Sequence, residues 1–327
     1  LVSTPVLRKS YLSPVGLLRL TAATLRSLPA SVELLRRTRP ALVLVNTVTV
    51  PVWIVLARML RRPAVCHVHE AEGTASAVVR KLLYLPLLAA TGLVVNSRFS
   101  LDVLAGAWPR LRRRALVVYN GVVGPAHPTP PRPRLDGPVR LLFLGRLSAR
   151  KGPQVAIAAV SELVSEGLDV QLRLLGAPFP GYEWFEDQLR RQVDGLGLRD
   201  RVEFLGFRPE IWPYLDAADV VLVPSTVDEP FGNTAVEAML ARRPLVVSAT
   251  SGLKEAAAGY RTAAQVPPDD ASALAGAIRS MVANWAQVVA DGAADLALAS
   301  QRHAPVEFRR EVRTAMLNLS GVPPKED

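Results

Sequence analysis

The sequence contains one cysteine, Cys66, among 327 residues. With no second cysteine, the chain cannot form an internal disulfide or a zinc site built on cysteines, and this composition is typical of proteins from a reducing compartment. Acidic residues are also fewer than basic ones, 29 against 39, which gives a net charge of +10. Most of these basic residues are arginines, and an excess of arginine can follow from a compositional bias of the whole genome. The alternative is an anionic partner, such as a nucleoside diphosphate or an acidic membrane face.

Three other kinds of signal are missing. The most hydrophobic segment, residues 41–60, includes Asn46, Pro51 and Arg58, so a buried strand followed by an apolar helix is a better prediction than a membrane span. No signal peptide is visible, and we expect a cytoplasmic protein. No basic stripe interleaved with aromatic residues occurs, and nucleic acid is therefore not predicted as a partner.

What remains is a regular alternation of short apolar runs and helical stretches. Continuous apolar runs are typical of parallel strands that are covered on both faces. Their alternation with helices implies right-handed crossovers and predicts an α/β fold with a doubly wound sheet. The predicted strands are residues 42–45, 64–68, 92–95 and 115–118 in the first half, and 139–144, 170–174, 202–204, 220–223 and 245–247 in the second.

A proline-rich segment separates the two halves. Residues 124–138 contain six prolines and two glycines, which predicts a semi-rigid linker without regular structure. We therefore expect two Rossmann-like domains, residues 1–123 and 139–305. Ligands of open α/β sheets bind at the carboxyl ends of the strands, so the functional motifs should line a cleft between the domains.

The first of these motifs follows the predicted strand 139–144. Gly145 allows a sharp turn after the strand, and Arg146 and Lys151 bring two cations beside the start of the next helix, which Gly152 and Pro153 introduce. Cations and the N-terminal amides of a helix together favour a diphosphate. On spacing alone, a solvated basic turn is the alternative.

The second motif follows the predicted strand 220–223. Glu229 and Glu237 stand eight positions apart with Gly232 between them, so one carboxylate can bind a sugar hydroxyl and the other a ribose diol. The amides near Gly232, Asn233 and Thr234 can bind a phosphate or sugar oxygen. The alternative for Glu237 is a purely structural capping box formed with Thr234.

Together these motifs give the chain a clear resemblance to family 4 of the retaining glycosyltransferases, which have the two-domain GT-B fold. The resemblance covers residues from about 40 to the end, and the Glu-x7-Glu motif is its most specific part. The matching segments are Gly145–Gly152, Phe204–Phe207, Ala218–Ser225, Glu229–Glu237, a degenerate Ser251–Glu255, and Val68–Glu70, Val95–Ser97 and Tyr119–Val122 in the first half.

The resemblance implies a role for each matching residue. Arg146 and Lys151, beside Gly145, would bind the donor diphosphate, Glu237 the ribose and Glu229 the transferred sugar. His69 would lie beside the reacting sugar. The remaining donor contacts would come from the loop that contains Phe207 and Arg208, which would lie against the base, and from the amides of Phe231, Gly232, Asn233 and Thr234. The final segment, residues 306–327, would return to the first, acceptor-side domain.

The implied reaction is transfer of a sugar from a nucleotide donor, such as a UDP- or GDP-hexose, to a hydroxyl of a glycan or lipid-linked acceptor, with retention at the anomeric carbon. Charge that develops on the departing diphosphate is best stabilised where it forms. The sequence has no Asp-x-Asp pair to hold a divalent metal there. We therefore predict that arginine and lysine replace the metal, and that no cofactor is required.

The chain departs from the family pattern at its start. Family members begin with a strand and a glycine-rich loop, and this sequence begins Leu1-Val-Ser-Thr-Pro5 without one. Either the first domain lacks these elements, or the residues that precede Leu1 are absent from this sequence.

Three alternatives stay open at this point. One is a nucleotide-sugar epimerase or hydrolase on the same fold, for which only His69, Glu70 and Glu72 are candidate acid–base residues in the first half. Another is a non-catalytic nucleotide-sugar-binding subunit. A third hypothesis adds a role in the membrane interface: the basic first domain contacts anionic lipid peripherally, at the inner face of the membrane.

Overall fold

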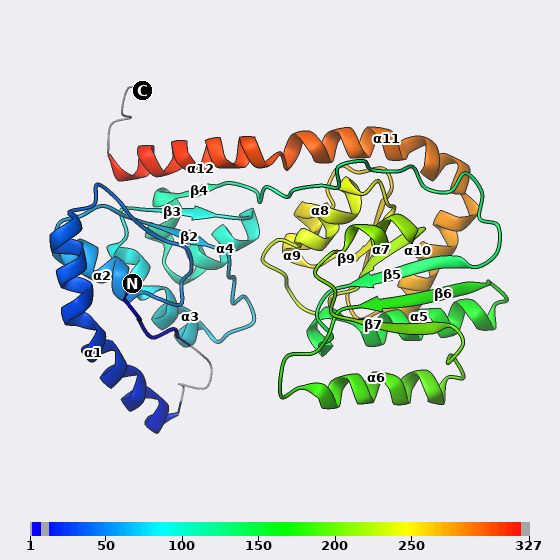
Figure 1. Cartoon of the computed structure of the whole chain (residues 1–327), viewed down its shortest axis with the longest axis horizontal. Helices are drawn as coiled ribbons and strands as arrows, with labels where there is room; N and C mark the ends of the chain where they lie inside the picture. The colour runs from blue at the N-terminus through cyan, green and yellow to red at the C-terminus, as the bar shows by residue number, and fades with distance from the viewer. Residues whose placement is uncertain (1, 8–12, 322–327) are drawn as a thin grey trace. The chain divides into compact units, whose positions relative to one another are not determined.

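The computed structural model describes residues 2–7 and 13–321. The chain divides into two compact units: unit 1 comprises residues 1–119 and 306–327, and unit 2 comprises residues 120–305 (Figure 1). Of the atypical start, residues 1–5, the structure describes residues 2–5, which form neither helix nor strand; residues 1, 8–12 and 322–327 lie outside the described residues. Each unit contains one parallel sheet with helices on both faces, so the predicted fold of two Rossmann-like domains is confirmed.

Unit 1 has a four-stranded sheet in the order β1-β2-β3-β4. Its strands are β1 (Val43–Val45), β2 (Ala64–Val68), β3 (Gly92–Val95) and β4 (Ala115–Val117), and its helices are α1 (Pro14–Thr38), α2 (Val52–Met59), α3 (Ala77–Tyr84), α4 (Arg98–Ala107) and the short 3-10 helices η2 (Leu85–Ala89) and η3 (Pro109–Arg114). The strand and apolar helix predicted within residues 41–60 are therefore present as β1 and α2.

Both faces of this sheet are covered, because successive side chains of a strand point to opposite sides. In β2, Cys66 and Val68 pack into a core with residues of α2 and α4. On the other face, Val65 packs against Val312 and Ala315 of helix α12 (Pro305–Ser320). The last described helix is therefore part of the fold of unit 1.

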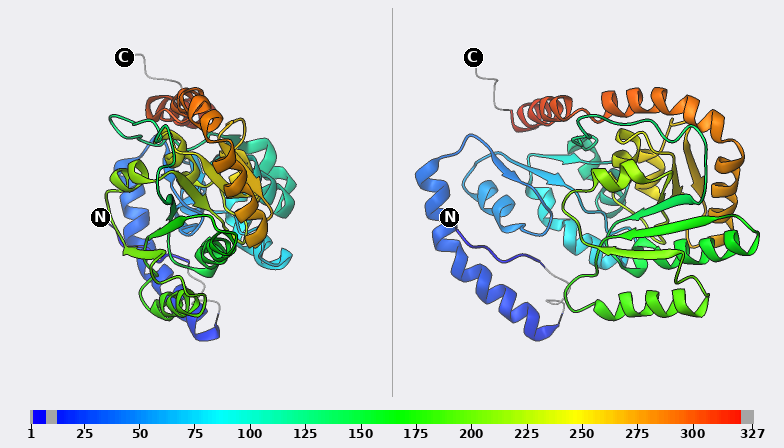
Figure 2. Two further views of the ribbon diagram at one scale, coloured as in Figure 1. Left: turned by 90° about the vertical axis from the view of Figure 1, so that its right-hand side faces the viewer. Right: turned by 45° about the vertical axis from the view of Figure 1, so that its right-hand side comes forward.

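Unit 2 has a six-stranded sheet in the order β10-β9-β8-β5-β6-β7. Its strands are β5 (Val139–Leu144), β6 (Val170–Leu175), β7 (Val202–Gly206), β8 (Val220–Val223), β9 (Leu245–Ser248) and β10 (Ala263–Val266). Its helices are α5 (Pro153–Ser165), α6 (Glu183–Gly195), α7 (Trp212–Ala217), α8 (Asn233–Leu240), α9 (Ser251–Ala256), α10 (Ala271–Ala283) and α11 (Trp285–Arg302), with the short 3-10 helix η4 (Ala149–Lys151). Figure 2 shows helices on both sides of this sheet.

The central strands of unit 2 explain why the sequence pattern was clear. β8 and β9 are buried along their whole length, which matches their unbroken apolar runs. The edge strand β10 was not predicted, because its sequence Ala-Ala-Gln-Val has small residues and only one side chain that favours a strand.

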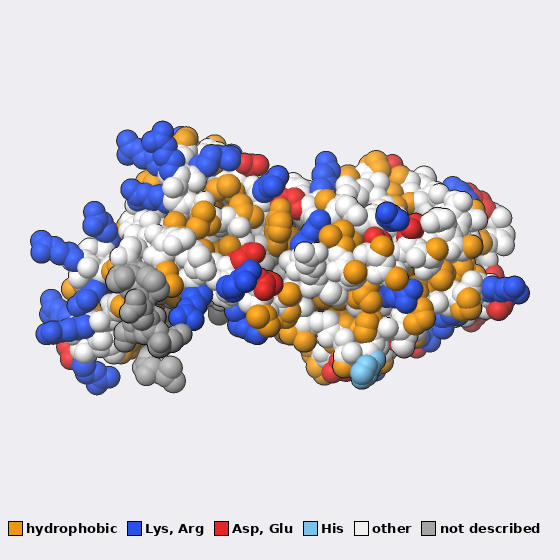
Figure 3. Space-filling view, turned by 90° about the horizontal axis from the view of Figure 1, so that it is seen from above, with side chains coloured by type: hydrophobic (Ala, Val, Ile, Leu, Met, Phe, Trp, Pro, Cys, Tyr) orange, Lys and Arg blue, Asp and Glu red, His pale blue; other side chains and the backbone are white. Residues whose placement is uncertain are grey.

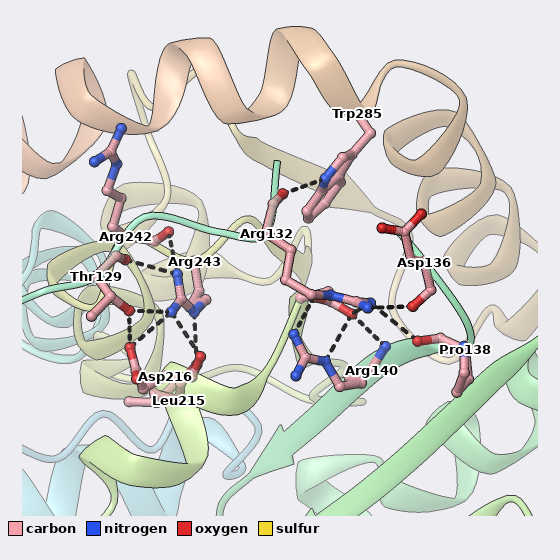
Figure 4. A network of polar contacts seen from close by, with 11 residues as sticks. Thr129, Arg132, Asp136, Pro138, Arg140, Leu215, Asp216, Arg242, Arg243 and Trp285 are labelled. Atoms are coloured by element: carbon pink, nitrogen blue, oxygen red, sulfur yellow. Dashed lines mark hydrogen bonds and ion pairs between the residues drawn. The ribbon is translucent and has the colours of Figure 1, made fainter. Parts of the chain in front are cut away.

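The proline-rich segment 124–138 contains no helix or strand, but it is fixed to unit 2 by two arginines (Figure 4). The Arg132 guanidinium donates to the fully buried carboxylate of Asp219, and the backbone oxygen of Arg132 accepts a hydrogen bond of 2.8 Å from the Trp285 indole. Arg243, which is 2% exposed, donates to the backbone oxygen of Thr129 at 3.0 Å. The segment is therefore an ordered part of the second unit.

Candidate functional site

Two loops at the carboxyl ends of β5 and β8 meet in direct backbone contact. Gly152 has a φ of +75°, and a Cβ atom placed on it would lie 1.8 Å from the backbone oxygen of Pro224. Only glycine fits there, because the left-handed conformation and the close approach both exclude a side chain. The backbone N–H of Thr226 also donates to the backbone oxygen of Arg150 at 3.0 Å. The two predicted motifs thus form one structure.

The contact between these loops brings Lys151 to Glu229. The Lys151 Nζ lies 2.7 Å from Glu229 Oε1, which also accepts a hydrogen bond of 2.8 Å from the Ser225 hydroxyl. Arg150 lies 3.5 Å from Glu229 Oε2. Glu229 is 4% exposed, so these partners compensate a carboxylate that has lost most of its water. Sequence reasoning missed Arg150 and Ser225, although both stand inside the motifs it used.

Helix α8 begins beside this cluster. Gly232 is its N-cap residue, with a φ of +107°, and no side chain among the described residues caps the helix. The capping box expected as the structural alternative for Glu237 is therefore wrong, because Thr234 already lies inside the helix. Uncapped N-terminal amides and the helix dipole favour a bound anion.

The segment Ser251–Glu255 contacts the backbone of the loop that contains Glu229. The backbone N–H of Gly252 donates to the backbone oxygen of Glu229 at 3.1 Å. A Cβ atom on Gly252 would lie 2.3 Å from that same oxygen. A larger residue would therefore displace the loop that carries the carboxylate.

Glu237 lies on α8 and is half-buried. Burial raises the pKa of its carboxyl, and the positive charge of Lys151 partly opposes that rise. A single lysine therefore acts on both glutamates of the Glu-x7-Glu motif.

An open pocket of about 470 Å³ lies next to the first loop and is lined by residues that follow β5, β6 and β7. Arg146, Phe179, Phe207 and Arg208 all contribute to its lining. The Arg146 guanidinium carbon lies 3.3 Å from the centroid of the Phe179 ring. Sequence reasoning missed Phe179. The pocket offers aromatic faces and guanidinium donors, which suit a planar heterocycle.

The structure thus separates the two predicted cations. Lys151 forms an ion pair with Glu229, whereas Arg146 lies against Phe179 and, within the described residues, forms no ion pair with Glu229 or Glu237. Burial lowers the pKa of Arg146, and the nearby charge of Arg150 lowers it further. An anion bound beside Arg146 would raise this pKa again and so oppose both effects.

Unit 1 has its own polar cluster at the carboxyl ends of β1 and β2. His69 Nε2 lies 2.9 Å from Asn46 Oδ1; because an amide oxygen can only accept, Nε2 carries the proton and Nδ1 is the basic nitrogen. Glu70 accepts hydrogen bonds from the Thr47 hydroxyl and from the backbone N–H of His69. The cluster therefore holds His69 in one tautomer.

His67, a residue of β2, lies next to His69. The rings of His67 and His69 are 4.0 Å apart between centroids. Burial lowers the pKa of both imidazoles, that of His67 to about 4. His69 is half-buried.

The Val95–Ser97 motif has a structural role instead. The Ser97 hydroxyl caps α4 by accepting the backbone N–H of Ser100 at 2.9 Å. Asn96 accepts a hydrogen bond of 2.9 Å from the Ser100 hydroxyl.

Two family models match the chain. Residues 138–284 match the model described as glycosyl transferases group 1, and residues 5–123 match the model described as glycosyltransferase family 4. Each half of the chain therefore matches a glycosyltransferase family. The first match includes the segment Gly145–Glu237, and the second includes His69.

Among curated relatives, a glycogen synthase of Mycobacterium tuberculosis is 34% identical to this chain over 171 residues, 51% of this chain and 39% of the relative. It is 31% identical to D-inositol 3-phosphate glycosyltransferase 1 of Catenulispora acidiphila over 217 residues, 62% of this chain and 52% of the relative. The chain therefore spans about half the length of these relatives or less.

Among solved structures, Anabaena HepE in complex with UDP superposes with a TM-score of 0.79 at 24% identity, covering 89% of this chain and 82% of HepE. HepE in complex with UDP-glucose gives a TM-score of 0.78. The chain thus has the GT-B fold. No helix in the described ranges is both long and apolar enough to cross a membrane.

Proposed function

We propose that the protein is a retaining family 4 hexosyltransferase that moves a sugar from a nucleoside-diphosphate sugar to a hydroxyl of a glycan or lipid-linked acceptor. The observation that carries the proposal is the contact of Lys151 with Glu229 beside the uncapped N-terminus of α8. One carboxylate, one ammonium and a helix N-terminus without a side-chain cap suit a sugar attached to a diphosphate.

Each part of the donor is assigned to a different part of this site. The heterocyclic base occupies the pocket at Phe207 and Arg208, and Glu237 accepts the ribose hydroxyls. Lys151, Arg146 and the amides of residues 231–234 stabilise the diphosphate as negative charge builds on it. Glu229 binds a hydroxyl of the transferred sugar, and its release from Lys151 on donor binding frees that ammonium for the phosphate.

His69 is the residue of unit 1 that we propose contacts the transferred sugar. Its tautomer, fixed by Asn46, presents Nδ1 as an acceptor for a sugar hydroxyl. In a retaining reaction the acceptor attacks from the face of the leaving group, and the departing phosphate can take the proton. No separate general base is then required.

We also propose that the transfer is metal-independent, because Lys151 and Arg146 supply the positive charge that a divalent ion supplies elsewhere. Transfer measured with and without a chelator tests this: full activity in the chelator is expected, and loss that added Mg²⁺ or Mn²⁺ restores would contradict it.

Binding and turnover together test the main proposal. Thermal unfolding with UDP-, GDP- and ADP-sugars should show a rise in Tm with one donor, because a ligand that binds only the folded state stabilises it. NMR of the product should show the anomeric configuration of the donor. Binding without transfer or donor hydrolysis would favour the non-catalytic subunit instead, and an altered sugar nucleotide would favour an epimerase.

We also propose that the protein reaches a lipid-linked acceptor by contacting the surface of an anionic membrane. Unit 1 holds 21 basic and 8 acidic residues, a net charge of +13, whereas unit 2 holds 18 basic and 21 acidic, a net charge of −3. Figure 3 shows lysine and arginine side chains spread over the surface of unit 1. Arg58 and Arg61 flank Met59, which is 73% exposed. This combination suits peripheral contact with an anionic membrane. Sedimentation with vesicles tests it, and equal binding to neutral and anionic vesicles would refute it.

A further inference from the structure

The motif Asn120-Gly-Val122 lies at the start of unit 2 and touches the proposed donor site. Asn120 Nδ2 donates a hydrogen bond of 2.8 Å to Oδ1 of Asn233, the first residue of α8. Because its oxygen is engaged by Asn120, the exposed Asn233 amide has its N–H₂ group left for a ligand. The contact therefore decides which end of that amide a ligand meets.

A buried histidine holds Asn120 in this position. His303 is 1% exposed, and its Nδ1–H donates to the backbone oxygen of Asn120 at 3.0 Å. Its own backbone oxygen accepts the N–H of Val122 at 3.0 Å. The His303 ring also lies 5.7 Å from the ring of Phe231, which is itself 2% exposed. His303 thus contacts Phe231, and Asn120 contacts Asn233, the two neighbours of Gly232.

The fixed amide discriminates between ligand groups. A sugar hydroxyl can donate or accept, so either end of an asparagine amide can bind it. A phosphate oxygen that is ionised can only accept, so it needs the N–H₂ end. Fixing the amide with its N–H₂ group free therefore favours binding of a phosphate oxygen, but it does not change binding of a hydroxyl.

We propose that Asn120, anchored by His303, is a positioning residue that orients the Asn233 amide so that it donates to a phosphate oxygen of the donor. The inference rests on the proposed donor site and assigns within it a contact specific for the diphosphate.

Asn120→Asp tests the orientation with almost no change in shape. A carboxylate at position 120 can only accept, so it turns the Asn233 N–H₂ toward itself and its oxygen toward the phosphate. The Kd should rise about tenfold or more for a nucleoside diphosphate, with the nucleoside itself bound as by the wild type. Asn120→Ala leaves Asn233 free to turn and should raise the Kd only about two- to threefold. The probes are UDP, GDP and ADP with their nucleosides, in calorimetric titrations.

A double-mutant cycle separates orientation from charge. If Asn120→Asp acts through Asn233, its effect should fall to about twofold or less in an Asn233→Ala background. An equal effect in both backgrounds would show that the new charge acts directly on the phosphate, and would overturn the proposal. An equal loss of nucleoside affinity would also overturn it.

Two further variants guard against misfolding. Asn233→Asp keeps the acceptor for Asn120 and places an acid in the first turn of a helix, where it favours folding, but it has no N–H₂ group; wild-type affinity for the diphosphate would refute the proposal. His303→Asn keeps a donor near the Nδ1 position and should stay within about twofold of wild type, whereas His303→Leu should match Asn120→Ala. If wild-type protein binds none of the three diphosphates, the donor site itself has failed, which is a different result from any of these.

Discussion

Replacing Lys151 by alanine should impair both turnover and folding, and the two effects have different sizes. In the free protein, the Lys151 Nζ is 2.7 Å from a Glu229 carboxylate that is 4% exposed. Removing one partner of a buried ion pair costs about 3–5 kcal/mol. Here Arg150 and the Ser225 hydroxyl still contact the carboxylate, so we expect the free energy of unfolding to fall by about 1–3 kcal/mol.

The effect on catalysis should be larger than the effect on stability. Loss of one preorganised donor to a developing anion lowers kcat by about 100- to 1,000-fold, or roughly 3–4 kcal/mol. Because the ammonium acts most strongly in the transition state, kcat should fall more than KM rises. Urea unfolding and steady-state transfer at saturating donor measure the two quantities on the same sample.

Arg150→Ala is the matched control for this experiment. It removes the same charge from the same carboxylate, but Arg150 is 3.5 Å away and its side chain is 48% exposed, against 24% for Lys151. Exposed pairs contribute about 0–1 kcal/mol, so this variant should be nearly as stable as wild type. Equal losses of kcat in the two variants would refute the special role of Lys151 and leave only a general effect of charge.

Three further predictions follow from single sites. Arg243→Met should lower the free energy of unfolding by about 3–5 kcal/mol in a urea titration, because it leaves the oxygens of Thr129 and Leu215 without their buried donor; a loss below about 1 kcal/mol would contradict the anchoring role. The folded-state pKa of His67 is lowered to about 4, so its contribution to stability is present above its unfolded value near 6.5 and is lost as the pH falls toward 4; His67→Phe should flatten that part of the pH–stability curve. The pKa of Glu237 is raised by burial, so donor affinity should increase as the pH rises through that raised value, and Glu237→Gln should abolish the dependence in pH-resolved titrations.

The sequence was most informative where burial dictates residue type. β8 and β9 are buried on both faces, and their unbroken apolar runs located them to within one residue. β10 was missed because an edge strand of small residues carries no such pattern. The proline content of residues 124–138 excluded regular structure correctly, but it gave no sign of the buried arginine that holds the segment in place.

For the candidate site, spacing located the loops but not all of their partners. The contact of Lys151 with Glu229 depends on the backbone approach at Gly152, which joins segments about 80 residues apart along the chain. Phe179 could not be found in the same way, because it follows a strand without a recognised motif and matters only through its contact with Arg146. Residue type indicated the chemistry at these positions, and long-range packing decided which groups meet.

Arg132 and Arg243, which hold residues 124–138 against the rest of unit 2, also determine where a fragment of this protein can begin. A fragment that starts at Pro138, where the match to the group 1 family begins, would keep Asp219 paired with Arg140 and Arg243 bound to Leu215, but it would lose the contacts that Arg132 and Thr129 make with them. A fragment that starts at Asn120 would keep both. Unit 2 expressed alone should therefore begin before the prolines, and proteolytic cleavage within residues 124–138 should destabilise unit 2.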